Sequence, residues 1–181
     1  MKMGTKWILG LMNVLSWIFF VALCFVTGSF LVTTILIMSR PDLIPVLWKE
    51  VDLTNLYWYN KNQFMIMNLI IILISGLEAF LFYRIIVLLN TPKLNINKPF
   101  TLAFGNFILS SAFLILTIGF LCLLGRKYRD WIVSKGVELP DVEVMRLAGA
   151  DVWIFMSVFL FFLGMIFRKA IEIQNENELT V

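Results

Sequence analysis

The chain of 181 residues contains no histidine, only two cysteines and few charged side chains. Without histidine it lacks the side chain that most often acts as a general base or a metal ligand. Cys24 and Cys122 lie in separate apolar runs, without the close spacing of zinc or thiol–disulfide motifs. No glycine-rich phosphate loop and no Gly-x-Ser-x-Gly element occurs. We therefore expect a protein that is not an enzyme and that uses no cofactor or metal.

The scarcity of charge also limits the solvent in which the chain can fold. Charged residues make up 15% of the sequence and hydrophobic residues 60%, whereas soluble domains carry about 25% charged residues. So little polar surface cannot cover a folded chain in water, which makes a lipid bilayer its expected surroundings. The net charge of +3 is small and dispersed, so we expect no direct binding of nucleic acid.

Four long apolar runs are each long enough to cross a membrane, since about 20 helical residues span the hydrocarbon. They are continuous and lack the alternation of β-barrel strands. The first, as a helix of about 50 Å, must either tilt and project or bend near Thr27-Gly28-Ser29. The sequence predicts an all-α membrane protein, a four-helix bundle in which residues 1–181 form one domain. The expected spans are 7–39, 64–89, 100–125 and 147–167, followed by an acidic tail over 168–181.

The basic residues give little indication of orientation. If both termini are inside, seven basic side chains lie on the inner side and eight on the outer side. The inner segments are shorter and therefore denser in positive charge, which favours both termini in the cytoplasm. The cluster Arg126-Lys127-Tyr128-Arg129 favours the opposite orientation. We expect a multi-pass protein of the cell membrane with cytoplasmic termini.

Glu78 is a charged residue inside the second expected span, where charge is costly and often functional. Counted from Arg84 as the edge, it lies about 9 Å deep. Asn13 and Asn106 lie at similar expected depths in the first and third spans. We hypothesise a buried polar layer in which Glu78 hydrogen-bonds to Asn106 and Asn13 and fixes the helix packing. The alternative is that Glu78 binds a proton or cation.

Asp151 lies in the first turn of the fourth expected helix, on the opposite side of the membrane from this layer. We expect it near Arg146 or the Arg126 cluster. A carboxylate at this place complements the positive end of its own helix dipole. Two acids at such different depths are a poor pair for a shared proton relay.

Two short motifs carry a family resemblance. The chain ends in a Glu-x-x-x-Glu-Asn-Glu-Leu-Thr-Val pattern over residues 172–181, and Pro99-Phe100-Thr101 precedes the third apolar run. Both resemble a family of uncharacterised bacterial membrane proteins, domain of unknown function twenty-nine seventy-five, although Glu178 stands where Asp is more usual and a basic cluster after Thr101 is missing. The resemblance implies a four-helix protein of the bacterial cytoplasmic (inner) membrane, encoded beside a small helix-turn-helix regulator. It implies no activity.

The tail is the expected contact for such a partner. An acidic helix end in the cytoplasm can bind a basic DNA-binding protein, or it can merely keep the end of the last helix soluble. The leading interpretation is a regulatory, partner-binding membrane protein. The rival is a small transporter or channel subunit, necessarily a homo-oligomer, with Glu78 as its ion- or proton-binding group. The candidate partner-binding residues are Glu172, Glu176, Asn177, Glu178 and Leu179.

Overall fold

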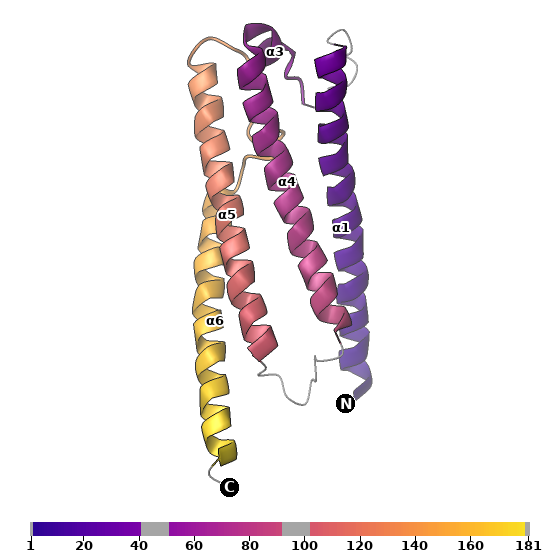
Figure 1. Cartoon of the computed structure of the whole chain (residues 1–181), viewed down its shortest axis with the longest axis vertical. Helices are drawn as coiled ribbons and strands as arrows, with labels where there is room; N and C mark the ends of the chain where they lie inside the picture. Colours follow the sequence, from indigo (N-terminus) through magenta and orange to yellow (C-terminus); the bar gives the residue numbers. More distant parts are fainter. Residues whose placement is uncertain (1, 41–50, 92–101, 180–181) are drawn as a thin grey trace.

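The computed structural model describes residues 2–40, 51–91 and 102–179 (Figure 1). Each long helix within these ranges contains a segment long and apolar enough to cross a membrane. The predicted fold class is therefore confirmed as an all-α bundle of four long apolar helices. The helices are α1 Lys2–Ser39, the short α3 Thr54–Tyr59, α4 Lys61–Asn90, α5 Leu102–Val133 and α6 Ala150–Leu179.

Helix α1 runs unbroken through Gly28, and Figure 1 shows no sharp bend along it. Its length is about 57 Å at about 1.5 Å per residue, well beyond a hydrocarbon thickness of about 30 Å. The helix therefore projects from a bilayer or tilts within it. A continuous helix satisfies its own backbone hydrogen bonds, which lipid cannot do.

The start of α4 is defined by a side-chain cap. The side chain of Asn60 accepts hydrogen bonds from the backbone N–H groups of Asn62 and Gln63, at 2.9 and 3.4 Å. These N–H groups have no carbonyl partner within the helix, so the cap satisfies them. It fixes the turn between α3 and α4 at the end of the bundle farthest from the chain termini (Figure 1).

Consecutive long helices run antiparallel, so both termini lie at the same end (Figure 1). The most extensive contacts join α1 to α4 and α5 to α6, and a smaller interface joins α4 to α5. Aromatic pairs mark the two larger interfaces, with Phe19 5.2 Å from Phe82 and Phe113 4.6 Å from Phe161 between ring centroids. The bundle thus consists of two helix pairs that meet along α4 and α5.

A glycine brings α5 and α6 close together. A Cβ atom on Gly119 would lie 2.8 Å from Cγ1 and 3.1 Å from the backbone nitrogen of Ile154. The second of these atoms cannot move without moving the helix. Small residues at such positions let membrane helices approach and gain van der Waals contact.

The segment between α5 and α6 folds back along α5. The sequence places the end of the third span at residue 125, but α5 continues to Val133. The chain then returns (Figure 1) until Leu147 lies against Gly125, whose Cβ would be 2.6 Å from the leucine Cδ2. Val137 and Met145 on this segment are also buried. Irregular backbone within a membrane is tolerated where it packs against protein, as it does at these buried positions.

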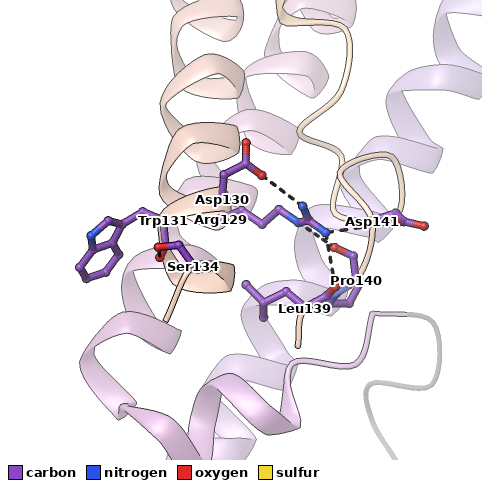
Figure 2. Close-up of polar contacts among 7 residues, drawn as sticks. All are labelled: Arg129, Asp130, Trp131, Ser134, Leu139, Pro140 and Asp141. Carbon is purple, nitrogen blue, oxygen red and sulfur yellow. Dashed lines mark hydrogen bonds and ion pairs between the residues drawn. The ribbon is translucent and has the colours of Figure 1, made fainter. Parts of the chain in front are cut away.

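Arg129 ties the returning segment to α5. Its Nε donates to the carbonyl of Pro140 at 3.0 Å and one terminal nitrogen donates to that of Leu139 at 3.5 Å (Figure 2). The same guanidinium pairs with Asp130 at 3.1 Å and lies 4.0 Å from Asp141. Carbonyl groups that lack a helical partner thus obtain one from a side chain.

Candidate functional site

Glu78 forms an ion pair with Arg146 inside the bundle. A terminal nitrogen of the arginine donates to Oε2 of the glutamate. Glu78 is buried on the face of α4 that also carries Ile71, Ile74 and Ser75, residues three or four positions apart and therefore on one side of the helix. Its partner comes from the segment that returns along α5. The pair thus joins α4 to that segment.

The backbone at Arg146 is shaped for this contact. Its φ of 58° lies in the left-handed region, which is uncommon for residues other than glycine. Gly149, just before α6, also has a positive φ of 74°. The carbonyl of Arg146 faces the Sγ of buried Cys122 at 4.0 Å. The chain thus turns sharply at Arg146 and again at Gly149 before α6 begins.

The pair balances two charges at membrane depth. An isolated charge at the centre of a membrane helix costs about 2.5–3.5 kcal/mol on insertion scales, and a charged partner offsets that cost. The compensation is incomplete, because the Nε of Arg146 is buried without a hydrogen-bond partner in the described part of the chain. A buried unpaired donor costs about 1–3 kcal/mol.

The three residues of the predicted polar layer lie in three separate contacts. The side-chain nitrogen of Asn13 donates to Oδ1 of Asn90 at 2.9 Å. Oδ1 of Asn106 accepts from Arg168 at 3.4 Å. Since Glu78 is paired with Arg146, the structure does not bring the three together.

Glu78, Asn13 and Asn106 do not meet because they lie at different depths in the bundle. The prediction counted Glu78 from Arg84, but α4 continues to Asn90, so Glu78 lies about 18 Å from the helix end. Arg84 donates to Oγ of Ser110, which places Asn106, one turn earlier on antiparallel α5, even farther towards the terminal end. Glu78 is therefore deeper than both asparagines.

Asp151 occupies the first turn of α6, as expected, and is exposed. It lines a shallow depression of about 670 Å³ together with Arg126, which fits its expected side of the membrane. The neighbouring basic residue Arg146 pairs with Glu78 instead. The two acids thus belong to separate environments.

A second polar site lies between α4 and α5, near the end of the bundle where both chain termini lie. It is a groove of about 450 Å³ whose lining includes Arg84, Asn106 and Ser110 beside the apolar Val87 and Phe107. The guanidinium of Arg84 lies over the Phe107 ring, 5.3 Å from its centroid. We refer to it below as the α4–α5 groove.

Sequence reasoning missed two of these features. Arg146 was expected only as a surface neighbour of Asp151, although it is a lone base within the otherwise uncharged stretch 144–150. That isolation is a usable signal for a buried partner. The sequence indicates Arg84 only as the edge of a span, and nothing in the sequence alone indicates the groove beside it.

The tail is helical as far as Leu179. Ile171 is buried and lies against Gly105 near the start of α5, so the residues after it extend past that start, as the lower end of α6 in Figure 1 shows. Lys169 pairs with exposed Glu172 at 2.8 Å. The side chains of residues 177–179 and the motif at residues 97–101 lie outside the described residues.

No family model, no curated protein and no solved structure matches this chain. What is established is an integral membrane protein with four candidate spans.

Proposed function

We propose that the chain is a non-enzymatic regulatory protein of the bacterial cytoplasmic membrane that binds a partner through the exposed end of α6. The observation that carries the proposal is that α6 continues to Leu179, past the apolar run and the basic pair Arg168-Lys169, through a mostly polar sequence. A segment that is already helical loses less conformational entropy on binding than a disordered one.

The chemistry of this end fits a basic partner. Glu172 and Glu176 are exposed and lie one turn apart on one side of the helix. Glu178 adds a third carboxylate in the sequence. The family resemblance of the tail implies a small helix-turn-helix regulator as the partner, and the DNA-binding surface of such a protein is basic.

Binding of the purified helix-turn-helix protein encoded beside the gene tests the proposal. The full chain in lipid nanodiscs should bind it, and a variant lacking residues 175–181 or carrying Glu172→Gln and Glu176→Gln should bind several-fold more weakly. Glu138→Gln is the matched control, because Glu138 is exposed and follows the end of α5 that lies opposite the chain termini. Equal binding by the full and truncated chains would remove the tail from the proposal.

The second candidate is a transporter or channel subunit, favoured by the carboxylate of Glu78 within a span. Because the main contacts among the described helices join each long helix to the next, a pathway would have to be enclosed by several copies. Liposomes containing the chain would then show proton or sodium flux that both Glu78→Gln and Glu78→Leu abolish. The absence of flux from well-folded protein would reject this candidate.

A further inference from the structure

Among the described residues that line it, the α4–α5 groove contains the cation Arg84 and no carboxylate. Arg84 donates to Ser110 and Arg168 donates to Asn106. Ser110 and Asn106 are one turn apart on α5 and both line the groove. Arg84 lines the groove as well, whereas Arg168 lies beside it and reaches it through Asn106. Among the described residues, neither arginine forms an ion pair; the cation next to Arg168, Lys169, is the one paired with Glu172.

Most of the other residues that line the groove are apolar, and some of them are exposed at its side. Phe80 and Val87 line it and are 49% and 47% exposed. Both lie within the candidate span of α4, where the neighbour of an exposed side chain is lipid. Phe80 is one turn farther from the terminal end than Arg84. The groove therefore leads from the cationic edge towards the hydrocarbon.

We propose that the α4–α5 groove binds an anionic phospholipid, with the phosphate at Arg84 and Arg168 and an acyl chain along Phe80 and Val87. A guanidinium presents five N–H donors in a planar fork that matches phosphate oxygens. Arg84 uses a single described hydrogen bond, which leaves donors for a ligand. Basic pockets between membrane helices are suited to lipid headgroups of this charge.

A lipid fits better than a free anion because of where the groove opens. A dissolved phosphate would have to leave water for a site bordered by half-exposed aromatic and aliphatic side chains. A phospholipid already carries its phosphate to the boundary and its chains into the hydrocarbon. The stacking of Arg84 on Phe107 keeps the guanidinium at this boundary by a cation–π contact.

Native mass spectrometry of the detergent-solubilised full chain tests the proposal. The protein is incubated with phosphatidylglycerol and phosphatidylcholine that carry identical acyl chains. We expect preferential retention of phosphatidylglycerol. Arg84→Gln and Arg168→Gln should each lower that preference about fivefold, the change expected for loss of about 1 kcal/mol per basic residue. Lys127→Gln, at an exposed site towards the other end of the bundle, should leave it unchanged.

Two further measurements are needed. One distinguishes a loss of lipid binding from a loss of folding, and the other distinguishes a lipid site from a site for a free anion. Val87→Trp fills the groove but keeps both arginines, so it should also reduce retention while the thermal unfolding midpoint stays close to that of the wild type. Unchanged preference in the Arg84→Gln, Arg168→Gln double variant would overturn the proposal. So would displacement of phosphatidylglycerol by millimolar inorganic phosphate, because that result identifies a free-anion site.

Discussion

The opposite charges of Glu78 and Arg146 reduce the free-energy cost of burying either side chain inside the bundle. Glu78 is buried in α4 and its partner reaches it from the segment that follows α5. Replacing a buried ion pair by apolar groups of similar volume is often neutral, whereas removing one member leaves an uncompensated charge. The two residues should therefore show strong energetic coupling.

Arg146→Leu should lower the free energy of unfolding by about 3 kcal/mol, because Glu78 then stays buried without a cation. Glu78→Gln should cost less than Glu78→Leu, since the amide keeps an oxygen that can accept from the arginine. Thermal unfolding in a mild detergent measures the differences.

The double variant Glu78→Leu, Arg146→Leu completes the cycle. It should be more stable than Arg146→Leu alone, because neither charge remains. If the two single losses simply add in the double variant, the residues do not interact and the ion pair is not the source of the effect.

At the scale of helices, the two tight pairs differ in how they are held together. The α5–α6 pair depends on the close approach at Gly119 beside Ile154. In α1, apart from the backbone of its own helix, no described atom lies within 4 Å of the place where a Cβ on Gly28 would lie. The two glycines therefore provide a matched comparison of packing against intrinsic helix propensity.

Gly119→Ala should lower the unfolding midpoint, since overpacking a tight contact costs about 1–3 kcal/mol. Gly28→Ala should leave the midpoint unchanged or raise it, because alanine is the better helix former. Both variants are measured by circular dichroism against temperature in the same detergent. A loss at Gly28 as large as that at Gly119 would contradict the role given to close packing.

The helices were predictable from sequence, but the connection between α5 and α6 was not. Long apolar runs determine spanning helices because lipid leaves the backbone no other partner. Beyond Gly125 the sequence turns charged, and hydropathy alone does not distinguish a solvated loop from a helix extended to Val133. The return that buries Leu147 and Arg146 depends on tertiary contacts with α4 and α5. For that reason the pairing of Glu78 with Arg146 could not be predicted from the sequence.

At the scale of the whole molecule, an even number of crossings places both chain ends on one side (Figure 1). Lys135 follows α5 at the other end, and it is exposed, as is Lys169 near the end of α6. These positions lie on opposite sides of a membrane whichever way the protein is inserted.

Labelling with a membrane-impermeant maleimide checks this arrangement. In a background of Cys24→Ser and Cys122→Ala, we expect Lys135→Cys to react from outside intact cells and Lys169→Cys to react only after the membrane is opened. The reverse result would keep the topology but invert the proposed cytoplasmic location of the termini. Reaction of both positions from one side would contradict the four crossings.

The distance along the chain between Glu78 and Arg146, 68 residues, imposes an order on biosynthesis. At about 5–20 residues per second, the ribosome adds the arginine roughly 3–14 seconds after the glutamate. During that interval α4 must enter the bilayer with its carboxyl group lacking its final partner. The ion pair therefore forms only after the stretch that follows α5 has been made and has docked against α4.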